Sequence, residues 1–250
     1  AGDELPRGQA GVVVALADKL ETLVGMFGIG NLPTGDRDPF ALRRHALGAI
    51  RMLVEKDLPL DLHTLLTSAV PAFGNKITDA TAQLEDFFFD RLSVSLREQG
   101  YTAQEVEAVL ALRPQRLSEV HKRLEAVRAF AMLPEAQALA AANKRVSNIL
   151  KKAEQDVLPQ VNESVLVESA EKDLFASLQT AAPLAHSQFA AGDYTSSLQT
   201  LAGLREPVDA FFQHVMVNAE DSALKSNRLG LLATLHIAMN RVADLARLAA

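Results

Sequence analysis

The chain has 250 residues, of which 48% are hydrophobic and 22% are charged, and this balance is typical of a folded protein rather than a disordered one. It contains no cysteine, which excludes disulfides, thiolate metal sites and a cysteine nucleophile. The formal net charge is −6, and both halves carry more acidic than basic side chains. Any contact with nucleic acid must therefore come from a local basic patch.

Apolar residues recur with the period of amphipathic helices along the chain, and no segment shows the sustained alternation of a strand. In the first predicted helix, Leu16, Leu20 and Leu23 fall on one stripe. Asp38 is predicted to cap the second helix, with Pro39 in its first turn. The predicted helices span residues 6–27, 38–56, 61–70, 78–99, 103–112, 114–132, 134–155, 169–190, 194–204, 207–219 and 224–248.

This pattern predicts an all-α fold with two helical bundles in tandem, and Pro134 is the best candidate for the boundary between them. No apolar run approaches the roughly 20 residues that would span a bilayer. The N-terminus carries no secretion signal. We therefore expect a soluble, cytoplasmic protein without a membrane partner. Because the sequence lacks an initiator Met, we also expect it to be part of a longer chain.

Motifs for self-contained catalysis are absent. The sequence has no P-loop, no His-Glu-x-x-His and no Gly-x-Ser-x-Gly, and its six histidines are not spaced as ligands on one helical turn. We therefore expect no catalytic residue, no metal site and no cofactor in this chain. Asp18 and Glu21 lie three residues apart on one helix face, so they are either an acid–base or metal-binding pair or part of an ordinary solvated face.

The sharpest local feature is the stretch NKRVSNILKK at 143–152, which holds four basic residues and no acidic one. On a helix, Lys144, Asn148 and Lys151 share the outer face, and Arg145 and Lys152 lie beside them. Lysine and arginine neutralise phosphates, and an asparagine amide can pair with an exposed base edge. This face is either an RNA contact or a normal solvated surface.

Several long stretches closely resemble one family, the β subunit of bacterial heterotetrameric glycyl-tRNA synthetase. The N-terminal stretch is ALADKLETLVGMFGIGNLPTGDRDPFALRRHALGAIRMLV at 15–54. The others are ANKRVSNILKK at 142–152, LREPVDAFFQHVMVNAED at 204–221, NRLGLLATL at 227–235 and RVADL at 241–245. Their order and spacing fit the family over nearly the whole chain.

The resemblance implies a role in glycine–tRNA ligase. In this family the α subunit carries the aminoacylation chemistry, for which it uses ATP and Mg²⁺, and the β subunit is needed for tRNA binding and activity. The resemblance implies the C-terminal part of an HD-like helical domain and a helical linker at 1–133. It implies an anticodon-binding domain, related to that of arginyl-tRNA synthetase, at 134–250. The expected partners are tRNA(Gly), the α subunit and the remainder of the β subunit.

The resemblance also gives the basic stretch a role, as the contact to the anticodon arm. Arg205, Arg228 and Arg241 lie in other matching segments and are weaker candidates for RNA contact. The family commonly has Asp-Lys-Leu-Asp where this chain has Asp18-Lys19-Leu20-Glu21, and the upstream ligands of true HD hydrolases are missing. Two alternatives stay open, a protein-interaction scaffold without RNA contact and a phosphohydrolase remnant that uses Asp18.

Overall fold

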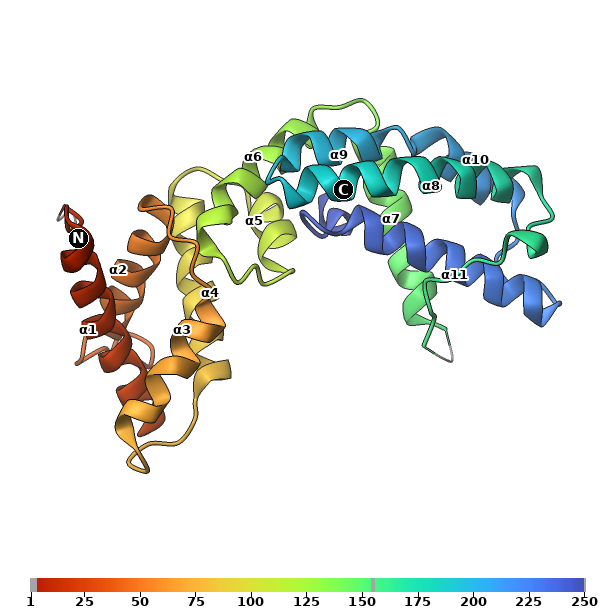
Figure 1. Ribbon diagram of the computed structural model, residues 1–250. Helices are drawn as coiled ribbons and strands as arrows, with labels where there is room; N and C mark the ends of the chain where they lie inside the picture. Colours follow the sequence, from red (N-terminus) through yellow and green to blue (C-terminus); the bar gives the residue numbers. More distant parts are fainter. Residues whose placement is uncertain (1–3, 154–155, 250) are drawn as a thin grey trace. The chain divides into compact units, whose positions relative to one another are not determined.

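The computed structural model describes residues 4–153 and 156–249, and within these ranges the chain is built of α-helices and short 3₁₀ helices. The described residues form no strand, and only two isolated β-bridges occur among them. The prediction of an all-α fold is confirmed (Figure 1). None of the described helices is long and apolar enough to cross a membrane.

The helices divide into two compact units. The first comprises the chain up to Tyr101 together with Arg113–His121, and the second comprises Thr102–Leu112 together with the chain from Lys122 onward. Pro134 lies in the turn between two helices of the second unit. The division of the chain at Pro134 stays a prediction.

The first unit packs around the apolar faces of four α-helices. They are α1 (Gln9–Gly28), α2 (Leu42–Glu55), α3 (Leu62–Ala69) and α4 (Thr81–Glu98), with the 3₁₀ helices η1 (Val70–Phe73) and η2 (Leu117–Glu119). Leu23, Leu53 and Leu66 have no exposed surface in this core. Asp38 accepts hydrogen bonds from the Leu42 and Arg43 amides at 2.7 and 3.0 Å, which confirms its predicted capping role. Pro39 precedes the helix rather than opening it.

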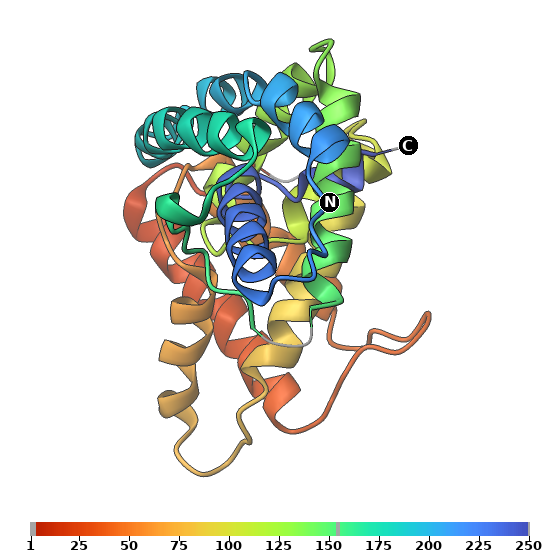
Figure 2. The ribbon, with the colours of Figure 1, turned by 90° about the vertical axis from the view of Figure 1, so that its right-hand side faces the viewer.

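The second unit is a larger bundle in which α8 packs against α9, α10 and α11, and α7 packs against α10 and α11 (Figures 1 and 2). Its α-helices are α5 (Ala103–Leu110), α6 (Val120–Ala131, from Lys122), α7 (Ala136–Lys151), α8 (Ser169–Ala190), α9 (Tyr194–Ala202), α10 (Arg205–His214) and α11 (Ser222–Met239). The 3₁₀ helices η3 (Glu163–Val165) and η4 (Leu245–Leu248) complete it. Asp193 caps α9 and Asp221 caps α11 with side-chain hydrogen bonds.

The last two predicted helices are too long at their C-terminal ends. The last one ends at Met239 rather than 248, because the turn after it is held by other groups: Asn240 Oδ1 accepts from the Leu245 amide at 3.0 Å, and Arg123 donates to the Arg241 and Val242 carbonyls. The helix predicted to reach 219 ends at His214, where Val215 turns to an extended conformation. In both places side chains from distant positions stabilise the loop backbone.

Candidate nucleic-acid interface

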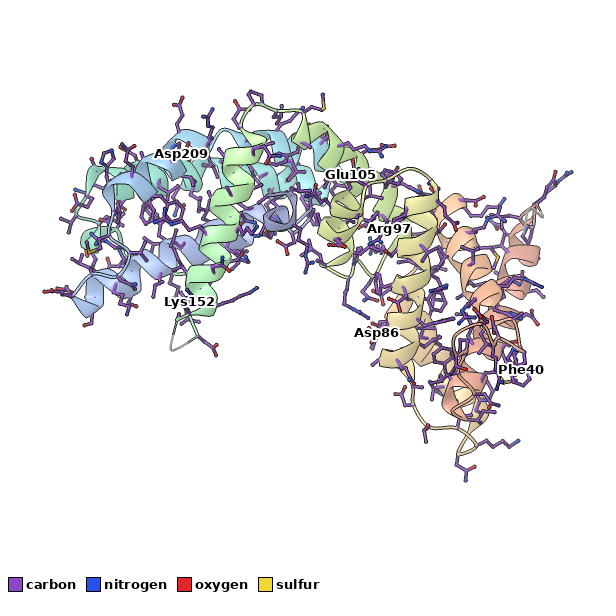
Figure 3. All side chains as sticks on the ribbon, turned by 180° about the vertical axis from the view of Figure 1, so that it is seen from behind. Phe40, Asp86, Arg97, Glu105, Lys152 and Asp209 are labelled. Carbon is purple, nitrogen blue, oxygen red and sulfur yellow. The ribbon has the colours of Figure 1, made fainter. Side chains whose placement is uncertain are left out.

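Helix α7 presents a polar face that we call the basic face. Its members are Lys144, Arg145, Asn148, Lys151 and Lys152, and all five are exposed. Leu139, Ala140 and Val146 are buried on the opposite side of the helix. Their exposure agrees with the prediction, and their contact with RNA stays a prediction. Figure 3 shows Lys152 at the C-terminal end of α7.

Hydrogen bonds between side chains fix α7 against α11. The amides of Asn143 and Asn240 donate to each other at 2.8 and 3.0 Å, and Ser147 Oγ lies 3.0 Å from His236 Nε2. Burial lowers the pKa of His236. The carboxylate of Asp244 raises this pKa, and the charge of Lys151 lowers it further. The lowered pKa favours the neutral imidazole at its contact with Ser147. The helix that carries the basic face is thus held to α11 by side-chain hydrogen bonds.

None of the four cations of the basic face forms an ion pair with another residue that the structure describes. The Arg145 guanidinium lies over the ring of Phe212 from α10, 4.3 Å from its centroid, which holds the cation in place without cancelling its charge. Lys151 lies in the last turn of α7 and also stabilises the helix dipole there. Lys144 and Arg145 lie outside that turn, so stabilisation of the helix dipole does not explain why cations occur at these two positions.

The weaker candidates on the surface lie on other elements. Arg205 begins α10 and forms an exposed ion pair with Asp209 at 3.5 Å. Figure 3 labels Asp209 on this helix. Arg241 is half-buried and its Nη1 lies 2.7 Å from His186 Nδ1. Each of these two guanidinium groups already has a partner. We therefore place neither in the basic face.

Arg228 lies in the core of the second unit. Its side chain is 7% exposed, its Nε forms an ion pair with Glu171 of α8, and its Nη1 donates to the Met216 carbonyl at 2.8 Å. The other oxygen of Glu171 accepts from the Val167 and Glu168 amides at 2.9 Å each. This arginine ties α11 to α8 and to the loop after α10. Its buried guanidinium cannot reach a phosphate at the surface, so we correct the expectation of RNA contact at Arg228.

The alternative metal or acid–base pair finds no support in the geometry. Asp18 and Glu21 are both exposed on α1. Among residues 4–153 and 156–249, no group of three or more His, Asp or Glu side chains could hold a metal ion. Their exposure fits a solvated face, and the interpretation as an acid–base or metal-binding pair stays a prediction.

Sequence reasoning missed a groove beside the basic face. It lies between the last turn of α7, the segment 156–165 and the first turns of α11, and its volume is about 1120 Å³. Lys225 and Asn218 line it together with Lys152. The sequence indicates this groove only weakly, because its lining residues are far apart in the chain and Lys225 is a lone cation in the polar first turns of a helix.

Comparison with known proteins gives two family matches. The family described as glycyl-tRNA synthetase beta subunit matches residues 1–111, and the family described as DALR anticodon binding domain matches residues 139–247. The second range includes the whole basic face and the groove.

Individual relatives match the whole chain. The glycine–tRNA ligase beta subunits of Delftia acidovorans and Paracidovorax citrulli are 80% and 76% identical to it, and that of Methylobacillus flagellatus is 61% identical. In each comparison 100% of this chain is covered, but only 36%, 35% and 36% of the respective relative. The chain therefore spans about a third of the length of these relatives.

Proposed function

We propose that this chain, which belongs to the glycyl-tRNA synthetase beta subunit family, binds the anticodon arm of glycine tRNA through the basic face of α7. The observation that carries the proposal is that four cations without ion-pair partners among the described residues lie along α7 and its C-cap, within the segment that matches an anticodon-binding domain. Lysine and arginine contact phosphates, and Asn148 can pair with the edge of an unstacked base.

In this proposal the chain supports glycine–tRNA ligation without carrying its chemistry. Aminoacylation takes place on a separate α subunit, which uses ATP and Mg²⁺, and this chain holds no cofactor of its own. Its partners are tRNA(Gly), the α subunit and the rest of the β subunit, in the cytoplasm. The two matched segments support a division of labour, in which residues 134–250 bind RNA and residues 1–133 belong to the HD-like part and a linker.

A second candidate is a scaffold that contacts only other parts of the ligase. The observation in its favour is on α1, where Val13 and Val14 are 66% and 69% exposed on one side of the helix. Exposed aliphatic side chains next to each other are suited to protein contact. The exposed valines belong to the first unit, whereas the basic face belongs to the second. Charge reversal on α7 should therefore weaken tRNA binding if the basic face contacts RNA, and leave it unchanged if the chain is a scaffold.

The test is charge reversal on the basic face in the complete ligase. We expect Lys144→Glu with Lys151→Glu to weaken binding of glycine tRNA by about tenfold or more, because phosphate contacts become repulsive. Formation of glycyl-adenylate without tRNA should stay unchanged. The matched control is Lys172→Glu, at an exposed lysine of α8 outside the basic face, which should leave tRNA affinity at the wild-type value. Unchanged tRNA affinity in the double variant would favour the scaffold.

A further inference from the structure

The loop of residues 29–41 connects α1 to α2 and contains no helix. Connections of about this length are usually either functional or disordered. This loop is ordered, because the Thr34 and Arg37 amides donate to each other's carbonyls at 3.0 and 2.8 Å. The Arg43 guanidinium of α2 also donates to the Gly35 carbonyl at 2.6 Å. Figure 2 shows the loop extending away from the helices of the first unit. The protein itself holds its shape, so a partner would not have to order it.

Two apolar side chains are exposed at the ends of this loop. Ile29 follows α1 and is 55% exposed, and Phe40 precedes α2 and is 44% exposed. Figure 3 labels Phe40. Ala41, directly after Phe40, has a φ of 53°, in the left-handed region that residues with a side chain disfavour. Backbone strain of this kind is concentrated at functional positions. A strained loop that exposes an aromatic side chain is suited to contact with a partner.

Cations lie around the loop at positions that the helix itself does not favour. Arg43 and Arg44 are the second and third residues of α2, whose first turn contains no acidic residue. They lie at the positive end of the helix dipole, where cations are unfavourable. Arg37 and Arg44 are exposed, and neither forms an ion pair with another residue that the structure describes. A partner that carries negative charge would account for this placement.

The chemistry of this surface favours a protein over RNA. Ile29 and Phe40 offer apolar surface for a hydrophobic pocket, and aromatic and arginine side chains are enriched in protein interfaces. The exposed carboxylate of Asp36, next to Arg37, would repel a phosphate. A second copy of this chain is disfavoured as well, because a two-fold contact through the loop would bring the arginines of both copies together.

We propose that loop 29–41, together with Arg44, docks this chain on the separate α subunit that carries the aminoacylation chemistry. The matching surface of the α subunit is an apolar pocket for Phe40, bordered by carboxylates that pair with Arg37 and Arg44. The inference rests on the proposed function, because it requires that the chemistry lies on a separate subunit. It assigns contact with protein to the first unit and contact with RNA to the second.

The experiment measures the affinity of the complete β subunit for the purified α subunit over a salt series. Phe40→Ala removes the apolar contact, and Arg37→Ala with Arg44→Ala removes the charges. Each variant should associate about tenfold more weakly or worse. Rising salt should weaken association of the wild type and of Phe40→Ala by similar factors. It should weaken association of the double arginine variant less, because salt screens the ion pairs that this variant lacks.

Two matched controls lie in the same unit. Val94→Ala removes a side chain of α4 that is likewise 44% exposed, and Lys56→Ala removes an exposed cation at the other end of α2. Both should associate with the α subunit as the wild type does. Thermal unfolding of each variant shows whether it is folded, and if one of the two loop variants is not, the other decides.

The outcomes separate the inference from the function on which it rests. Wild-type association of the folded loop variants would overturn the inference. Normal association with weakened binding of glycine tRNA would also overturn it, since the loop would then contact RNA. The RNA contact is judged by Lys144→Ala with Lys151→Ala, which should associate normally and bind tRNA weakly. If this variant binds tRNA normally while the loop variants fail to associate, the basic face fails as the RNA contact and the docking loop stands.

Discussion

Arg145 and Arg228 belong to the same helical bundle, but their charges lie in opposite surroundings. Arg145 is exposed and rests on the Phe212 ring. Arg228 is buried and pairs with Glu171. Both occur in segments that resemble the same family, so the resemblance alone could not separate the two roles. Burial separates them, since a phosphate can be reached only from the surface.

Replacement of Arg228 should affect stability rather than RNA recognition. Arg228→Ala leaves the Glu171 carboxylate buried without its cation, which costs about 3–5 kcal/mol of the free energy of unfolding. Replacement of both partners by apolar residues, Arg228→Met with Glu171→Leu, should restore much of this stability. Chemical denaturation of the chain measures the effect. An equal loss in the single and double variants would show that the pair is not the source of the instability.

Glu171 should also make the second unit sensitive to acid. Burial raises its pKa, but the hydrogen bond from Arg228 and those from the Glu168 and Val167 amides outweigh this effect, so the pKa is lowered overall. A lowered pKa means that stability is fully present above the unfolded value of 4.5 and is lost as pH falls through the lower folded value.

The acid prediction has a matched variant. The free energy of unfolding of the wild type should fall below pH 4.5, and that of Arg228→Met with Glu171→Leu should fall less steeply over the same range. Denaturant titrations at a series of pH values give both curves. Parallel curves would mean that other carboxylates cause the acid sensitivity.

At the scale of the elements, the packing of segment 156–165 on α11 requires a small residue at position 230. Gly230 lies in the middle of α11, where glycine lowers helix stability, yet a Cβ at this position would lie 2.1 Å from a backbone oxygen. The nearby bonds between Asn227 and Asn162 hold the same crossing. The close approach therefore explains the glycine.

Gly230→Ala should push the segment away from α11. We expect a loss of about 1–3 kcal/mol in the free energy of unfolding, as for other insertions into packed regions, and faster amide hydrogen exchange in residues 156–165. Gly203→Ala is the matched control, because a Cβ there would meet its nearest neighbour at an ordinary 3.4 Å. Equal behaviour of the two variants would contradict the close packing.

Helix periodicity predicted the elements well and their ends less well. The apolar residues within the stretch 143–152 predicted the inner side of α7, opposite the basic face, and Val146 is buried there. The ends of α10 and α11 could not be read from the pattern, because Arg228 and Arg123 hold the following loops through bonds to backbone carbonyls. The groove could not be predicted from the sequence either, because the segments that form its walls come together only in the folded bundle.

At the scale of the whole molecule, the negative net charge of the chain contrasts with the positive charge of the basic face of α7. The chain carries −6 overall, yet α7 presents four cations without ion-pair partners among the described residues. A protein of this kind does not attract RNA through its total charge, so the local patch has to supply the affinity. The salt dependence of binding reports how many phosphates that patch neutralises.

The most direct measurement is therefore a salt series of glycine tRNA binding to the complete ligase, for the wild type and for Lys144→Ala with Lys151→Ala. The account predicts that the logarithm of affinity falls linearly with the logarithm of salt concentration. The slope should become shallower by about 1.4 in the double variant, which loses two phosphate contacts at about 0.7 each. An unchanged slope would contradict the account, since it would mean that the basic face of α7 does not touch the RNA backbone.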